Sequence, residues 1–178
     1  KFCKSEKIEI RGEVFISKKD FRSLNNSLDE KNKFSNPRNA ASGSLRQIDS
    51  KVSKDRPLQF IPHSYGYVSN YDEFLTFDKY LIFCEKNNFK ISNYSRKYKK
   101  LSDVYEYVKK IEKNRSEIGF DIDGMVIKIN DINTQNMLGN TSKYPRWAVA
   151  AKFSSEKALS KVREIDLQVG RTGAITPV

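Results

Sequence analysis

Two lysines of this 178-residue chain stand on predicted strands whose other residues are mostly apolar. Across residues 121–129, alternation places Lys128 on one face with Gly124 and Val126, and the opposite face is apolar as well. An unpaired ammonium group is costly to bury, so Lys128 must either reach water or meet an anion. The missing side chain at Gly124 would leave room for a ligand on that face. The simpler alternative is a lysine near a strand end that points into solvent.

Lys152 repeats this pattern on the next predicted strand, residues 146–153. One face of that strand carries two cations with two alanines between them: Arg146, Ala148, Ala150 and Lys152. Such a face would form a shallow, positively charged groove that suits a phosphate or a nucleotide better than a packed core. The alternative interpretation is an edge strand with a solvated basic face.

Glu13 and five arginines are further candidates for binding a nucleotide or a nucleic acid. Glu13 follows Gly12 on the polar side of its strand, where it could accept hydrogen bonds from ribose hydroxyls or form a surface ion pair. Arginines near Pro, Gly or Ser in turns suit bidentate phosphate contacts. These arginines are Arg38, Arg46, Arg115, Arg146 and Arg171. The turn at residues 170–173 would add backbone N–H groups, which also suits a phosphodiester.

The composition favours a polyanionic partner. The formal net charge is +11, from 33 Lys and Arg against 22 Asp and Glu, which favours phosphate neutralisation. A lysine-rich genome bias spread over a solvated surface would give the same excess. Cys3 and Cys84 match no metal-binding or disulfide pattern, so two reduced thiols in a cytosolic protein are expected. The one histidine, His63, is expected to have no catalytic role.

Neither a membrane anchor nor an export signal is predicted. No apolar run reaches membrane-spanning length, and the first residues lack a signal-peptide pattern. The chain lacks an initiator Met and stops within an apolar segment, so both ends are expected to be cuts through a longer protein.

Short alternating strands interspersed with helices predict an α+β fold. The expected strands cover residues 7–16, 58–68, 120–130, 146–153, 161–169 and 173–178. The expected helices cover residues 17–28, 71–85 and 101–113, with Ser17 and Ser102 as N-caps, and a short helix ends near Gly139. A turn at residues 36–39 precedes a short helix over residues 40–47, capped by Asn39. Residues 154–159 form a linker or a short helix.

Five segments, in order along nearly the whole chain, resemble motifs of one enzyme family, the bacterial NAD-dependent DNA ligases. IEIRGEVF resembles nucleotidyltransferase motif III of these ligases, and FSNPRNAASGSLRQID resembles a segment specific to them. GFDIDGMVIKIN resembles motif IV, and PRWAVAAKF resembles motif V. QVGRTGAITPV resembles the opening of their OB-fold domain. In this numbering the segments are residues 8–15, 34–49, 119–130, 145–153 and 168–178.

The resemblance implies a nucleotidyltransferase (adenylation) fold over residues 1–154, followed by the first strands of an OB-fold β-barrel over residues 155–178. The family adenylates itself with NAD, transfers AMP to a DNA 5′-phosphate and seals the nick in replication and repair. The first step needs a lysine in a KxDG motif, and the chain contains none. By resemblance the fragment alone is therefore expected to be inactive. The complete enzyme is expected to be a cytoplasmic monomer that acts on nicked duplex DNA.

The resemblance also implies residue roles. Glu13 would contact the adenosine ribose, and Lys128 and Lys152 would stabilise charge on the reacting phosphate. Asp123 would orient the site or a Mg²⁺ ion, or instead position Lys128. Any zinc site of the family would lie outside this chain. Phosphate contacts are expected from Arg38, Arg46 and Arg115, and from Arg171 on the OB-fold side.

Two other classes of protein remain open at this point. A basic nucleic-acid-binding module without chemistry would explain the charge but does not require lysines on apolar strands. An ATP-dependent ligase or an RNA-capping enzyme would share the shorter motifs, but the NPRNAASGSLRQ segment favours the NAD-dependent type. A KxDG motif upstream of Lys1 in the parent protein would support a ligase, and its absence would favour a binding module.

Overall fold

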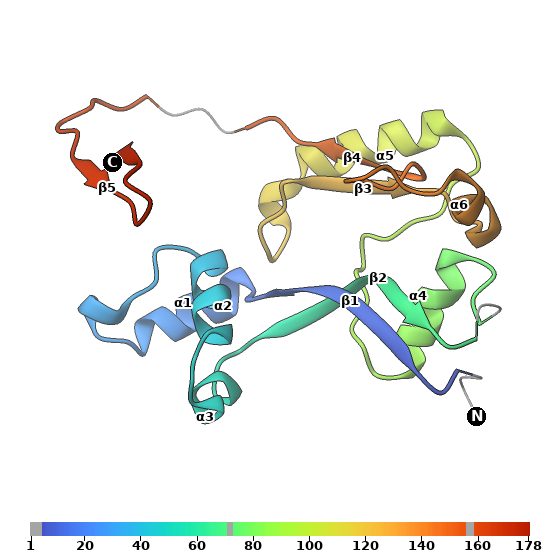
Figure 1. The fold of residues 1–178 in the computed structure, drawn as a ribbon, viewed down its shortest axis with the longest axis horizontal. Helices are drawn as coiled ribbons and strands as arrows, with labels where there is room; N and C mark the ends of the chain where they lie inside the picture. Colours follow the sequence, from blue (N-terminus) through green and yellow to red (C-terminus); the bar gives the residue numbers. More distant parts are fainter. Residues whose placement is uncertain (1–4, 71–72, 156–158) are drawn as a thin grey trace.

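The computed structural model describes residues 5–70, 73–155 and 159–178. Within these ranges the chain forms three two-stranded antiparallel sheets surrounded by short helices (Figure 1). This confirms a mixed α and β architecture with small antiparallel sheets. No helix in the same ranges has both the length and the apolar character needed to cross a membrane.

The first sheet pairs β1 (Ile8–Phe15) with β2 (Gln59–Val68). Its register shifts between Arg11, which pairs with Ser64, and Gly12, which pairs with Pro62. His63 is therefore the extra residue of a bulge. The segment between the two strands contains α1 (Lys18–Asn26), η1 (Glu30–Asn32), α2 (Pro37–Leu45) and α3 (Ser50–Lys54).

Two apolar clusters anchor this sheet. Ile16, Ala40 and Ala41 are buried where α2 packs against the end of β1. At the other end, α4 (Phe77–Lys86) contributes Tyr80 and Cys84, both fully buried, to the second cluster. The Tyr80 hydroxyl donates to the Ser64 carbonyl at 2.6 Å. Cys84 is a free thiol, and Cys3 lies outside the described residues.

The second sheet pairs β3 (Gly124–Lys128) with β4 (Ala148–Lys152), with α6 (Ile132–Leu138) between them. Its cover comes from α5 (Leu101–Lys113) and η2 (Arg115–Glu117). Ile111, Ile118 and Phe153 are the buried residues of this cluster.

The two sheets are joined at both of their ends. At one end, Thr76 forms a β-bridge with Asp131, and the Phe77 N–H donates to the Asn130 carbonyl at 2.8 Å. At the other end, the Lys18 N–H donates to the Gly119 carbonyl at 2.8 Å. The rings of Phe15 and Phe120 also meet there, with centroids 5.0 Å apart. These contacts fix the position of the β3–β4 sheet relative to the β1–β2 sheet.

The third sheet is a hairpin of β5 (Leu167–Val169) and β6 (Ile175–Pro177), drawn apart from the other elements in Figure 1. Its strands pair only with each other, and Leu167, Val169 and Ile175 remain 64–71% exposed. The hairpin is thus not inserted into the sheet that carries Lys128. Its assignment to an OB-fold, and the domain boundary at residue 154, stay predictions.

Several predicted boundaries were wrong. The expected turn at residues 36–39 is the first turn of α2: Asn36, not Asn39, is the N-cap, and its side chain accepts the Asn39 N–H at 2.7 Å. Pro37 fits the first helical position because that residue needs no N–H donor. Lys100, not Ser102, occupies the N-cap of α5, and the Ser102 hydroxyl donates to Asp103 instead.

Other elements are shorter than predicted. The helix expected over residues 71–85 begins at Phe77, and residues 71–72 lie outside the described part. Each strand of the second sheet spans five residues, and β5 only three. The expected burial of both faces of residues 121–129 was also wrong, because Val126 is 60% exposed. Sequence patterns also missed α3.

Candidate functional site

Lys128 and Lys152 lie on the same face of the second sheet. Lys128 pairs with Ala148, and Gly124 pairs with Lys152. Directly paired residues of antiparallel strands project to the same side, and alternate residues share a face. The two lysines therefore stand at opposite ends of one open face. Along the ladder the two lysines are four residue steps apart, which is about 13 Å at roughly 3.3 Å per residue.

Lys128 is half-buried and held by two neighbours from the first half of the chain. Its Nζ donates to the main-chain carbonyl of His63 and lies 4.4 Å from the centroid of the Phe77 ring. Burial lowers the pKa of Lys128 to about 8. Among the described residues, no carboxylate lies within 4.0 Å of this ammonium group. Lys128 is thus a partly desolvated cation without a charged partner among the residues that the structure describes.

His63 is near both Lys128 and Glu13, because the charges of both act on its ring. Burial and the nearby Lys128 ammonium lower the pKa of His63, whereas the Glu13 carboxylate acts in the opposite direction. Glu13 is exposed on β1 and pairs with Ile61, two residues before His63. Two of the three residues expected to converge therefore lie around the bulge of β2. No sequence pattern indicated that His63 would contribute its main-chain carbonyl there.

The side chain of Lys152 has no contacts with described residues like those that hold Lys128. It is exposed at the end of β4, and no described carboxylate lies within 4.0 Å of it. It shares a face with Lys128, but no contact links it to Glu13 or His63. Lys128 and Glu13 are thus both near His63, whereas Lys152 stands at the far end of the face, and their convergence on one substrate stays a prediction.

Gly124 has a packing role, contrary to the expectation that it leaves room for a ligand. A Cβ atom added there would overlap the Ala151 carbonyl oxygen and lie 2.9 Å from the Lys152 Cα atom. Because both obstacles are backbone atoms of β4, Gly124 permits the close approach of the two strands.

Asp123 pairs with Arg38, at 3.3 Å between carboxylate and guanidinium, and both side chains are well exposed. The alternative that Asp123 positions Lys128 is therefore wrong, because His63 and Phe77 do so instead. The described residues contain no group of three or more His, Cys, Asp or Glu side chains that could hold a metal ion. A Mg²⁺ ion at Asp123 stays a prediction and would need ligands from the substrate or from other residues.

The other predicted phosphate-binding arginines differ in their surroundings. Arg46 is the exposed C-cap residue of α2, and Arg171 is exposed in the turn of the β5–β6 hairpin. Arg115 is half-buried, and its Nη1 donates to the Ser154 carbonyl at 2.9 Å. Arg115 therefore ties η2 to the end of β4, whatever else it contacts.

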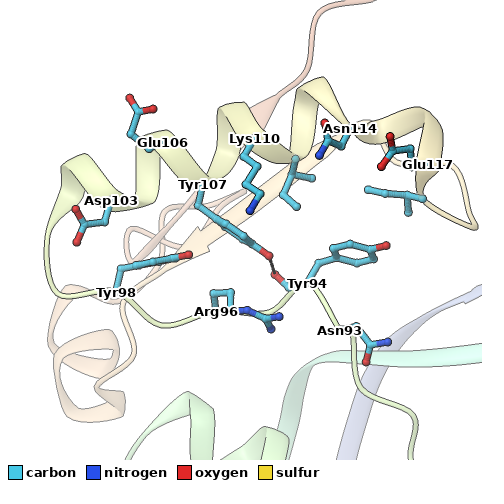
Figure 2. Close-up of a pocket in the computed structure, with 12 residues that line it drawn as sticks. Asn93, Tyr94, Arg96, Tyr98, Asp103, Glu106, Tyr107, Lys110, Asn114 and Glu117 are labelled. Carbon is cyan, nitrogen blue, oxygen red and sulfur yellow. Dashed lines mark hydrogen bonds between the residues drawn. The ribbon is translucent and has the colours of Figure 1, made fainter.

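A cavity of about 790 Å³ lies elsewhere, between α5 and the preceding loop (Figure 2). Tyr107 crosses it and donates to the Tyr94 carbonyl at 3.0 Å. Its charged lining is mixed, with two cations and three carboxylates: Arg96, Lys110, Asp103, Glu106 and Glu117. None of its lining residues belongs to the Lys128 face, so this cavity is not part of the candidate site.

Comparisons with known proteins identify the same family as the motifs. The family model described as "NAD-dependent DNA ligase adenylation domain" matches residues 2–156. A DNA ligase of Natranaerobius thermophilus is 46% identical over 182 residues, covering 100% of this chain and 27% of that protein. DNA ligases of Bartonella tribocorum and Gluconobacter oxydans are 44% and 43% identical, covering 96% and 97% of this chain and 24% and 26% of their own length. The chain thus spans about a quarter of the length of these relatives.

Proposed function

Because this chain belongs to the adenylation-domain family of NAD-dependent DNA ligases, we propose that it forms part of an enzyme that seals nicks in duplex DNA. NAD transfers AMP to a lysine of the enzyme and releases nicotinamide mononucleotide. The enzyme passes this AMP to the 5′-phosphate of the nick, and the 3′-hydroxyl then attacks that phosphate and releases AMP. The 178 residues contain no KxDG motif, so this chain alone does not form the enzyme adenylate. The complete enzyme acts in the cytoplasm as a monomer, in replication and repair.

The observation that supports this proposal best is the open face of β3–β4, with a lysine at each end. Phosphoryl transfer is assisted mainly by positioning and by stabilising charge on the phosphate oxygens. Lys128 supplies an ammonium group that is fixed before the substrate arrives, and Lys152 supplies a second at the far end of the face. Glu13 accepts a hydrogen bond from the ribose, near His63. Mg²⁺ would add a further positive charge when bound.

The arginines would hold the DNA without reading its sequence, as a ligase requires. Arg38, Arg46 and Arg115 contact phosphates beside the nick, and Arg171 contacts them from the β5–β6 hairpin, which begins the OB-fold. Arg38 can bind a phosphate only if its guanidinium releases the Asp123 carboxylate or contacts both anions at once. A binding module without chemistry is the weaker candidate, because it gives no role to the half-buried Lys128.

A chimeric enzyme tests the proposal. The matching segment of the relative with 46% identity is replaced by this chain, and nick sealing is measured with NAD or ATP. Sealing should require NAD. Changing Lys128 or Lys152 to Ala should slow the chemical step by roughly 10²–10³-fold, the usual effect of removing one charge-stabilising donor.

The matched control is Lys79→Ala, which removes an exposed lysine from α4. It should seal at the unchanged rate. A folded chimera that seals equally well without Lys128 and without Lys152 would refute the proposed roles. The free chain mixed with NAD and Mg²⁺ should show no added AMP by intact-mass spectrometry.

A further inference from the structure

The start of α4 is locked to the residues that follow β3. The Asp78 N–H donates to the Asn130 side-chain oxygen at 3.0 Å, and the Asn130 amide donates back to the Asp78 carboxylate at 2.8 Å. Lys97 also donates to Asp78, at 3.0 Å. A hydrogen bond from Thr76, together with those from Asn130 and Lys97, holds the pKa of Asp78 well below its usual range. Asp78 therefore stays ionised and keeps this joint closed at any ordinary pH.

This joint places the Phe77 ring over the end of β3. Phe77 precedes Asp78, Lys128 lies two residues before Asn130, and the ring centroid lies 4.4 Å from the Lys128 Nζ. The Phe77 ring also packs against Tyr80, with centroids 5.5 Å apart. Because the ring also packs against the buried cluster around Tyr80, it cannot easily turn away from the ammonium group.

An ammonium group has three N–H donors and favours the electron-rich face of an aromatic ring. At Lys128 one donor is used by the His63 carbonyl, and the Phe77 ring covers another side. Neither neighbour carries a charge, so neither would compete electrostatically with a phosphate for this cation. No other hydrogen bond from the Lys128 Nζ to a described residue is present, so its remaining donors can serve a ligand.

We propose that Phe77 is a positioning residue for Lys128: its ring and the His63 carbonyl hold the ammonium group where its free donors meet the reacting phosphate. The Asp78–Asn130 joint keeps Phe77 in place. This inference rests on the proposed function, since it presumes that Lys128 meets a phosphate. Phe77 itself touches no substrate and acts only through the lysine.

Two changes at position 77 test this role. Phe77→Leu keeps an apolar side chain of similar size but removes the ring, and trifluorophenylalanine keeps the shape but weakens the ring's attraction for cations. In the chimeric ligase, each should slow single-turnover sealing about 3–30-fold, the range expected for losing one cation–π contact. The affinity for nicked DNA should change less than twofold. Phe77→Tyr, which retains the ring, should seal at nearly the normal rate.

A second readout uses the 178-residue chain without any ligase assay. NMR titration of the Lys128 side chain should give a lower pKa with trifluorophenylalanine than with Phe, because the charged form loses stabilisation while burial stays the same. Phe83→Leu is the matched control, since Phe83 packs in the same cluster against Phe74. It should lower thermal stability without moving the Lys128 pKa or the sealing rate.

The outcomes separate the two proposals. If Lys128→Ala leaves sealing unchanged, the proposed function of Lys128 fails, whatever Phe77 does. If Lys128→Ala stops sealing while both changes at position 77 leave the rate and the Lys128 pKa unaltered, the positioning role is wrong. The fluorinated side chain preserves packing, so the test does not depend on whether Phe77→Leu folds.

Discussion

The two ends of the β3–β4 ladder are held in different ways. At the Lys128 end, a main-chain carbonyl, an aromatic ring and a backbone bridge provide the contacts. At the Lys152 end, a backbone hydrogen bond and the Phe15–Phe120 contact also join the sheets, but the nearby charged side chains only form ion pairs with one another. Arg38 pairs with Asp123, where both side chains are exposed, and the partly buried Lys18 pairs with Asp121. Exposed ion pairs contribute little and are screened by salt. The Lys128 side chain thus has a fixed geometry, whereas the exposed Arg38–Asp123 pair at the second end can rearrange around a polyanion.

This difference assigns separate tasks to two residues that look alike in sequence. Lys128 is fixed and partly desolvated, which suits a contact with the reacting phosphate. Lys152 is exposed and unsupported by described neighbours, so its geometry would be set by the bound substrate. The comparison can be tested at each end.

Replacing each lysine by arginine should give the largest contrast. The planar guanidinium is bulkier than an ammonium group and would present its donors in a different geometry beside the His63 carbonyl and the Phe77 ring. Lys128→Arg should therefore slow sealing by the chimeric ligase roughly 10²-fold, as if the donor were lost. Lys152→Arg should stay within a few-fold of normal. Equal tolerance at both ends in single-turnover assays would contradict the comparison.

Gly124→Ala should disturb the Lys152 end through the backbone. The added Cβ would overlap the Ala151 carbonyl oxygen, so β4 would have to move. Overpacking of this kind costs about 1–3 kcal/mol of unfolding free energy, measurable by urea denaturation. Gly119→Ala is the control, because a Cβ there meets nothing within 4 Å. Similar stability of the two variants would show that the strands separate easily.

The pH dependence of stability and of sealing should report the titration of Lys128. The folded-state pKa of about 8 lies below the usual lysine value of about 10.4, so the folded chain binds fewer protons between these two values. Its stability contribution therefore rises with pH across that window. The proposed role of Lys128 requires the charged form, so sealing by the chimera should fall above pH of about 8, approaching tenfold per unit. This decline should be unchanged in Lys152→Arg, and a decline that instead follows Lys152 would overturn the assignment.

The arginines should separate DNA binding from stability. Arg46→Ala should lower the slope of log affinity against log salt by about 0.9, the contribution of one neutralised phosphate. The loss of affinity should be similar for unrelated nick sequences. Arg115→Ala should lower the melting temperature as well, because its bond to Ser154 is lost. If Arg46→Ala lowers only the melting temperature, the residue is structural.

Asp123→Asn should give the smallest effect. It weakens an exposed ion pair, so the unfolding free energy should change by less than about 1 kcal/mol. Because Arg38 is then freed, nicked DNA should bind slightly more tightly at low salt, and the gain should fade as salt rises. A large loss of stability would show that this end is as firmly fixed as the other.

The sequence predicted the strands better than the joints between them. Alternation located β1 and both lysines, since a strand repeats every two residues. It could not identify the neighbours of Lys128, because its His63 partner lies 65 positions away and depends on a bulge in β2. The Arg38–Asp123 pair spans 85 positions and was equally hidden. Side-chain patterns also misjudged Gly124, whose role depends on the closeness of a partner strand.

The isolated β5–β6 hairpin has a consequence for how the chain unfolds. A two-stranded ribbon is only marginally stable in water, and apolar residues such as Leu167 and Ile175 gain nothing from burial here. This ribbon should therefore unfold separately from the cooperative unfolding of the rest of the chain. Its backbone amides should exchange with deuterium through local opening. The amides of β1 and β2 should exchange only when the clusters around Ile16 and Tyr80 unfold.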